Sequence, residues 1–303
     1  MSITVRAPAK VNLALIVGRP REDGFHPLNT IYQAISVYDD VRATEADEWS
    51  VSVVPLGEAD VTGVPLDESN IVVRAGRALA EHHGIDLAAT FEIQKGIPVA
   101  GGLAGGSADG AAALVALDRL WDLRTTDDDL LEIAGLLGSD VPFALLGGSA
   151  HGLGHGELVT PVTDHGSYWW VVVPHPEGLS TPAVYREFDR LHPDVAADGH
   201  TNDPAALVAA LEAGDADDLA ASMRNDLEEA AFSLRPELAE RLRMVQEHCA
   251  SRMMLSGSGP TIVGIVPSQE AALESRAALL EDGLPVVHVA TGPVAGAHVV
   301  EYV

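Results

Sequence analysis

The sequence predicts a two-domain protein of mixed α and β structure, and three observations lead to this prediction. The chain has 303 residues, which exceeds what a single hydrophobic core usually organises. Apolar residues make up 47% of it, enough to fill two cores. Between residues 147 and 163 the pattern of strands and helices loosens into glycine, histidine and serine. We therefore expect one domain in residues 1–160 and a second, small α+β domain in residues 161–303.

In the first domain, predicted strands and helices alternate along the chain, with a loop over residues 18–27. Strands are expected where apolar residues alternate with polar ones or run together, at residues 3–17 (two short strands around a polar interruption), 30–37, 49–54 and 91–97. Helices are expected from helical spacing and from start and stop residues, at residues 71–83, from Ser107 onward, and at residues 126–137.

The second domain begins with an apolar strand at residues 168–173 and continues after Pro182 with alanine- and leucine-rich segments that indicate helices. Its last part has the order strand, turn, strand, helix, strand, at residues 253–255, 261–266, 268–281 and 286–290. This order is typical of a small α+β domain.

Charge and cysteine content exclude several classes of protein. Acidic residues outnumber basic ones by 45 to 18, for a net charge of −27, and Lys10 and Lys95 are the two lysines. Nucleic-acid binding needs a basic surface, so we expect no nucleic-acid partner. No run approaches the ~18 apolar residues of a membrane helix, and residues 1–6 lack the pattern of a secretory signal. Because the single cysteine, Cys249, cannot form an internal disulfide, we expect a cytoplasmic protein without a membrane partner.

The strongest local signal is a glycine-rich segment between a predicted strand and a predicted helix. Its four glycines are Gly101, Gly102, Gly105 and Gly106, and the helix is expected to begin at Ser107. Glycine permits unusual backbone angles and close approach of a ligand, while the first N–H groups of a helix attract anions. The segment lacks the lysine of the Gly-x4-Gly-Lys phosphate loop and the spacing of the dinucleotide fingerprint. It therefore predicts an anion site, with a plain flexible connection as the alternative.

Lys10 and Asp140 are charged residues in unusual places. Lys10 lies at the edge of an apolar strand, which indicates either a functional ammonium or a lysine that extends to the surface along its aliphatic stem. Asp140 follows a helix-ending glycine and precedes Val-Pro, the usual place of a helix N-cap. A functional role for Asp140 depends on its meeting Lys10 in space.

Two short turns are further candidates for ligand contact. The turn Asp23–His26 combines the ring of Phe25 with the imidazole of His26. If exposed, this pair suits stacking on a planar ring and hydrogen bonding to its edge; the alternative is a tucked turn beside a surface histidine. The turn Leu255–Pro260 is rich in glycine and serine, and a tight hairpin explains it equally well.

Taken together and in this order, six segments resemble the GHMP kinase superfamily. They are Pro8–Leu13, Asp23–His26, Asn70–Arg74, Pro98–Ala108, Leu137–Pro142 and Leu255–Pro260. The first two of these narrow the resemblance to the branch that acts on a cytidyl diphosphate. The resemblance implies an α+β, two-domain GHMP kinase fold, with an N-terminal ribosomal-protein-S5-like α/β domain that binds ATP. It also implies a C-terminal, ferredoxin-like α+β domain on the substrate side.

The resemblance also implies an activity. The γ-phosphoryl group of ATP would pass to the 2-hydroxyl of the erythritol moiety of a small cytidyl diphosphate substrate, in non-mevalonate isoprenoid precursor biosynthesis. Lys10 and Asp140 would form the catalytic pair, in which the carboxylate accepts the hydroxyl proton and the ammonium offsets developing charge. Mg²⁺ is expected on the triphosphate, with Ser107 as the first candidate ligand and Asp140 as the second. The protein would act as a monomer or a homodimer.

Binding roles follow from the same resemblance. Asn12 would position the substrate, Phe25 and Tyr185 would sandwich the cytosine, and His26 would read its edge. The ATP phosphates would be wrapped by Pro98, Val99, Ala100, Gly101, Gly102, Leu103, Ala104, Gly105, Gly106, Ser107 and Ala108. Phe25 stands where many relatives have tyrosine, which keeps the stacking surface and loses a hydroxyl.

Two alternatives differ in the predicted reaction. The first is another small-alcohol kinase of the superfamily, of the mevalonate or homoserine type, against which the Phe25-His26 turn argues because those substrates have no base to stack. The second is a nucleotide-binding module without turnover, against which the presence of both Lys10 and Asp140 argues.

Overall fold

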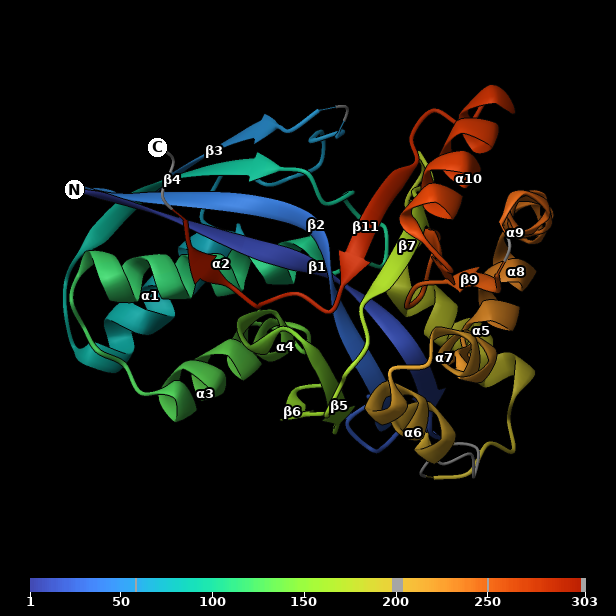
Figure 1. The fold of residues 1–303 in the computed structure, drawn as a ribbon. Coiled ribbons are helices and arrows are strands. Elements are labelled where there is room, and N and C mark those ends of the chain that lie inside the picture. The colour runs from blue at the N-terminus through green and yellow to red at the C-terminus, as the bar shows by residue number, and fades with distance from the viewer. Residues whose placement is uncertain (58, 198–203, 250, 301–303) are drawn as a thin grey trace.

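The computed structural model describes residues 1–57, 59–197, 204–249 and 251–300, and these form two β-sheets with helices packed alongside each (Figure 1). Two long antiparallel strands, β1 (Ser2–Val17) and β2 (Leu28–Ala46), form the centre of the first sheet. β2 also pairs with β4 (Ala88–Lys95), which pairs in parallel with β3 (Ser50–Pro55).

Short strands from later in the chain complete this sheet. They are β5 (Ser149–Leu153), which pairs with β2, β6 (Leu158–Pro161), which pairs with β5, and β8 (Arg224–Asn225) and β12 (His298–Val299), which pair with β1. The strand that carries Lys10 is therefore buried between neighbours from both halves of the chain.

Helices from the first half of the chain lie along one face of the first sheet (Figure 1). They are α1 (Ile71–His83), α2 (Gly105–Leu120), α3 (Asp127–Leu137) and α4 (Val141–Leu146). The buried side of α2 consists largely of alanine, including Ala108, Ala112 and Ala116. Because these side chains are small, α2 packs closely on β1 and β2, which brings its N-terminus near Lys10.

The second sheet is antiparallel, in the order β11 (His288–Gly292), β7 (Tyr168–Val173), β10 (Ile262–Val266) and β9 (Met253–Leu255). Its helices are α5 (Thr181–Leu191), α6 (Ala205–Ala213), α7 (Ala216–Ser222), α8 (Glu228–Leu234), α9 (Glu237–His248) and α10 (Gln269–Glu281). Trp170, fully buried in β7, donates its indole N–H to Gln33 Oε1 of β2 at 3.0 Å, which ties the two sheets together. In the described ranges, none of the helices has the length and apolar character needed to cross a bilayer.

Most of the predicted elements are confirmed, and two predictions about strands are wrong. Residues 3–17 were expected to form two strands but form the single strand β1, whose polar middle is accommodated by irregular pairing with β2. The loosened region around residues 147–163 contains β5 and β6, which the sequence did not reveal. Both strands are short and lack a clear apolar alternation; β5 forms because β2 offers a pairing edge to residues 149–152, and β6 then pairs with β5.

Candidate active site

A cavity of about 910 Å³ is lined by residues from both halves of the chain. The residues predicted for catalysis and substrate binding all line it, and they are Lys10, Asn12, Phe25, His26, Asp140 and Tyr185. Most of the glycine-rich loop lines it too, but Leu103 and Ala108 are fully buried outside the lining. The structure therefore brings the predicted site residues together in one place.

Irregular pairing between β1 and β2 brackets Lys10 and Asn12. The register shifts between Pro8 and Ala9, and again after Asn12, so the two residues lie between two irregularities. Such bulges are common beside active sites, where they re-aim side chains. Since residues two apart on a strand point to the same face, Lys10 and Asn12 both reach the cavity.

A chain of hydrogen bonds holds Lys10. Its ammonium donates to Asn12 Oδ1 at 2.6 Å, and Asn12 Nδ2 donates to Thr30 Oγ1 at 2.8 Å. The Thr30 hydroxyl in turn donates to the Ala14 carbonyl at 2.7 Å. All three side chains are buried. Asn12 thus positions the lysine directly, and Thr30, which the sequence analysis did not single out, positions Asn12.

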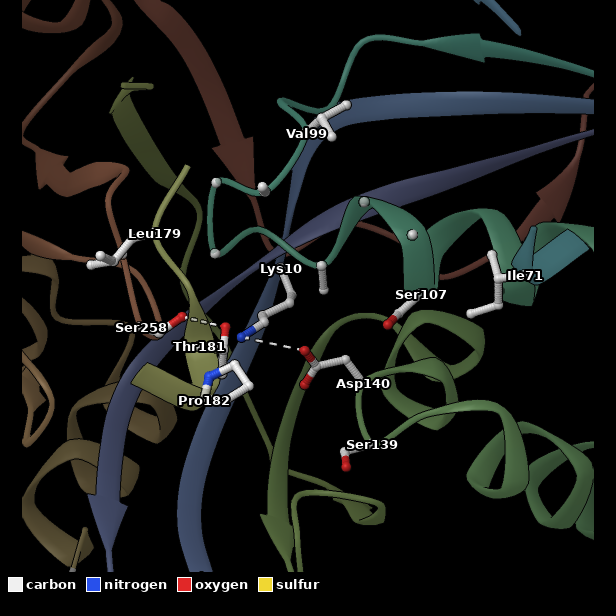
Figure 2. Close-up of a pocket in the computed structure, with 18 of the residues that line it drawn as sticks. Lys10, Ile71, Val99, Ser107, Ser139, Asp140, Leu179, Thr181, Pro182 and Ser258 are labelled. Carbon is white, nitrogen blue, oxygen red and sulfur yellow. Dashed lines mark hydrogen bonds and ion pairs between the residues drawn. The ribbon is translucent and has the colours of Figure 1, made fainter. Parts of the chain in front are cut away.

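Asp140 faces Lys10 across the cavity (Figure 2), with its Oδ2 3.7 Å from Lys10 Nζ. It occupies the N-cap position of α4, but its side chain makes no capping hydrogen bond. The carboxylate is therefore directed to the lysine, and the capping alternative is not supported. Tyr32 lies beside the pair, its ring centroid 5.4 Å from Lys10 Nζ. Burial, together with the nearby Asp140 carboxylate, raises the pKa of Tyr32 well above its usual range, so its phenol stays neutral.

The glycine-rich loop passes through left-handed backbone conformations at Ala100, Gly102 and Ala104, with φ of 55°, 78° and 57°. Helix α2 begins at Gly105, two residues before the predicted start at Ser107. The prediction was wrong because Ser107 has the residue type of a cap, whereas the left-handed turn at Ala104 is what ends the loop. No side chain caps α2, so its first N–H groups remain available to an anion.

The second glycine-rich turn packs directly on this loop. It joins β9 to β10 as the predicted hairpin, and Ser256 Oγ donates to the Gly102 carbonyl at 3.2 Å. At Gly257 a Cβ would lie 3.6 Å from Lys10 Nζ. The turn is therefore both a hairpin and a wall of the cavity, and it places the backbone of the second half of the chain beside the lysine.

The contact between the two turns leaves no room for a side chain at Gly102. A Cβ there would fall 2.3 Å from the Ser256 carbonyl oxygen, at a φ of +78°. We expect Gly102→Ala to lower the free energy of unfolding by at least ~1–2 kcal/mol and to raise the KM for ATP, because loop and turn must separate. Gly135→Ala in α3 is the matched control, since that helical residue lies outside the cavity lining and a Cβ on it meets nothing within 4 Å. Equal effects of the two substitutions in urea unfolding and ATP kinetics would contradict this account.

Two of the aromatic residues that line the cavity form pairs with histidines. Phe25, 58% exposed, stacks on His155 with ring centroids 4.6 Å apart. His26 packs on Tyr185 at 4.8 Å, with its ring tilted by 42°. The structure thus places Phe25 and Tyr185 in the same cavity, but the partner of each ring within the protein is a histidine.

A buried ion cluster lies below the start of α2. Lys95 Nζ donates to Asp39 Oδ2 at 2.5 Å and to Asp109 Oδ2 at 2.8 Å, and all three residues are at most 3% exposed. Burial raises the pKa of both Asp39 and Asp109. For Lys95, burial opposes the charge, but the two carboxylates outweigh it and raise its pKa. A Cβ at Gly105 would lie 3.1 Å from Lys95 Nζ, so the cluster supports the first turn of α2.

Several residues that shape the site were missed by the sequence analysis. Asn225 donates to the carbonyls of Leu255 and Gly257 at 2.9 and 2.8 Å, and so fixes the second turn. Lys95 is the one for which a signal existed, because it is one of the two lysines in the sequence and follows an apolar strand pattern. Its partners Asp39 and Asp109 are ordinary aspartates in the sequence, and nothing local distinguishes them.

Two family models match this chain. One, described as GHMP kinases N terminal domain, matches residues 70–148, and the other, described as GHMP kinases C terminal, matches residues 207–283. A protein of a Nocardioides species, named 4-diphosphocytidyl-2-C-methyl-D-erythritol kinase, is 57% identical over 98% of this chain and 100% of its own length. A protein of the same name from Kineococcus radiotolerans is 48% identical over 89% of this chain and 83% of its own length.

A solved structure extends the likeness to three dimensions. It is described as the crystal structure of 4-(cytidine 5′-diphospho)-2C-methyl-D-erythritol kinase, and it matches with a TM-score of 0.75 and 31% identity over 96% of this chain and 98% of its own. The chain belongs to the GHMP kinase family, and its two-domain α+β fold is confirmed. It is an ATP-dependent kinase of a small molecule. Within that family it resembles proteins named 4-diphosphocytidyl-2-C-methyl-D-erythritol kinase over 89–98% of its length.

Proposed function

We propose that this kinase transfers the γ-phosphoryl group of ATP to the 2-hydroxyl of 4-diphosphocytidyl-2-C-methyl-D-erythritol. The observation that carries the proposal is the 3.7 Å pair of Lys10 and Asp140 beside the glycine-rich loop, in a cavity that Phe25, His26 and Tyr185 also line. The full-length likeness to kinases of that name supports the choice of substrate.

The proposed reaction asks the protein mainly for positioning and charge stabilisation. The substrate oxygen bonds to the γ-phosphorus, the bond from that phosphorus to the β–γ bridging oxygen breaks, and ADP leaves. The hydroxyl proton passes to Asp140, while Lys10 offsets the charge that develops on the oxygen. The loop 98–107 and the first N–H groups of α2 would hold the phosphates without further basic side chains, which suits a chain of net charge −27.

The donors in the cavity fit Mg²⁺ bound mostly through the triphosphate. Mg²⁺ in kinases usually takes one or two protein oxygen ligands besides phosphates and water, and the residues described hold no cluster of three or more acidic, histidine or cysteine side chains for a protein-only site. The Ser107 hydroxyl is the oxygen that would hold it, with the Asp140 carboxylate as the second candidate, and both line the cavity. When bound, the ion would neutralise charge on the phosphates.

The division into domains, the location in the cell and the oligomeric state stay predictions. We place the domain boundary near residue 160, so that residues 1–160 bind ATP and residues 161–303 form the substrate side. The start of β7 at Tyr168 supports this division, although β8 and β12 return to the first sheet. A cytoplasmic location and a monomeric or homodimeric state are likewise predictions from the sequence.

A panel of acceptors with γ-labelled ATP tests the proposed function. We expect label on 4-diphosphocytidyl-2-C-methyl-D-erythritol, at the 2-hydroxyl by ³¹P NMR, and none on mevalonate or homoserine. Phosphorylation of mevalonate or homoserine in place of the cytidyl substrate would overturn the choice of substrate. Tight ATP binding without transfer to any acceptor would favour a nucleotide-binding module.

A further inference from the structure

His26, the residue predicted to read the edge of the base, pairs with an aspartate that has no part in the proposed reaction. Asp189, on the same face of α5 as Tyr185, places its Oδ1 2.8 Å from His26 Nε2. The imidazole is 9% exposed and packs against the rings of Tyr185 and Phe188, at 4.8 and 6.3 Å. Helix α5 therefore fixes both the plane of the ring and the partner of one of its nitrogens.

The identity of that partner determines where the imidazole carries its proton. An ionised carboxylate only accepts hydrogen bonds, so Nε2 must carry a hydrogen to bond with Asp189. Nδ1 of the neutral ring is then an acceptor. Nδ1 makes no hydrogen bond to any part of the chain that the structure describes, and His26 lines the cavity. The open nitrogen is thus the one that would meet a ligand.

Cytosine and uracil differ at the position that such an acceptor would read. Cytosine carries an exocyclic amino group, which donates, where uracil carries a carbonyl oxygen, which accepts. Stacking on Phe25 or Tyr185 does not separate the two, because every base offers a π-face. Discrimination therefore requires a hydrogen-bonding group with a fixed direction.

We propose that Asp189 is a positioning residue that holds the His26 proton on Nε2, so that Nδ1 accepts a hydrogen bond from the cytosine amino group and the site rejects uracil. This inference rests on the proposed function, since it requires a pyrimidine nucleotide as substrate. The inference assigns to Asp189 a part in selecting cytosine over uracil, which Asp189 would exert through His26 without contacting the base.

The test compares the cytidyl substrate with its uridyl analogue, 4-diphosphouridyl-2-C-methyl-D-erythritol, in the wild type and in Asp189→Asn. An asparagine amide can donate to Nε2 and so favour the other tautomer, with Nδ1 as a donor. We expect the kcat/KM for the cytidyl substrate divided by that for the uridyl analogue to fall by about 10- to 100-fold in Asp189→Asn. The KM for ATP should be unchanged. Asp194→Asn, an exposed aspartate just beyond the end of α5, is the matched control and should leave the ratio as in the wild type.

Two other outcomes would overturn the inference. If Asp189→Asn lowers kcat/KM equally for both substrates, or leaves both unchanged, Asp189 does not set the choice of base. ¹⁵N NMR of histidine-labelled wild type gives a second readout, and a neutral His26 protonated on Nδ1 would contradict the proposal without reference to activity. If the wild type phosphorylates neither nucleotide, the proposed function fails, and the NMR result alone decides the position of the proton.

Discussion

Asp140→Asn is expected to lower kcat by about 100- to 10,000-fold while the Kd for ATP stays nearly the same. The amide has the shape of the carboxylate but cannot take up the hydroxyl proton. Because the Asp140 side chain makes no capping hydrogen bond, α4 should tolerate the change and the melting temperature should stay within a few degrees of the wild type. Steady-state kinetics, ATP titration and thermal unfolding together check this expectation.

A matched control separates this effect from a general loss of acidic charge. Asp128→Asn, on the exposed side of α3, removes the same charge away from the cavity and should leave kcat unchanged. An Asp140→Asn enzyme that retains wild-type turnover would show that Asp140 is not the base. A variant that loses turnover only together with its fold would point to a structural role.

Lys95→Met is expected to cost about 3–5 kcal/mol of the free energy of unfolding. The substitution keeps much of the side-chain length but leaves Asp39 and Asp109 facing each other, with side chains at most 4% exposed and no cation between them. Asp109 Oδ1 already lacks a hydrogen-bond partner within the described residues, so little is available to compensate. Urea unfolding measures this loss of stability directly. Because the cluster supports the first turn of α2, the Kd of the variant for ATP should also rise.

The exposed pair of Arg42 and Glu92 provides the comparison for Lys95→Met. These side chains are 51% and 33% exposed and 3.2 Å apart, so Arg42→Met should cost less than ~1 kcal/mol. Adding Asp109→Asn to Lys95→Met removes one of the two opposed charges and should recover part of the stability. If Lys95→Met and Arg42→Met lower the free energy of unfolding equally, the buried charges of Lys95, Asp39 and Asp109 do not stabilise one another more than an exposed pair does.

Local signals account for what the sequence predicted well. Helix α1 runs over the predicted residues 71–83 because the residues at its two ends cap it. Asn70 accepts a hydrogen bond from the Val72 N–H, and Gly84 adopts a left-handed conformation. Most of the proposed site residues lie in the short motifs that carry the family resemblance, whereas Tyr185 lies outside them. Such features depend on a few consecutive residues, so they can be predicted without knowledge of the three-dimensional structure.

The features that could not be predicted depend on residues far apart in the chain. Lys95 and Asp39 are 56 positions apart, and His26 and Asp189 are 163 apart. Nothing in the neighbourhood of either aspartate marks it as a partner, because partnership follows from how strands and helices pack. The hydrogen bond from Ser256 to Gly102 also joins residues far apart in the chain. The local sequence explains each of the two turns, but it does not predict that they pack against each other.

The burial of both lysines has a practical consequence. Lys10 is 7% exposed and Lys95 is 2% exposed, and both ammonium groups are engaged by carboxylates. A bulky reagent directed at lysine should therefore leave both of these side chains unmodified while the chain is folded. Lysine acylation followed by mass spectrometry should thus report unfolding, with Lys10 labelled when the cavity opens and Lys95 labelled when the first sheet separates from α2.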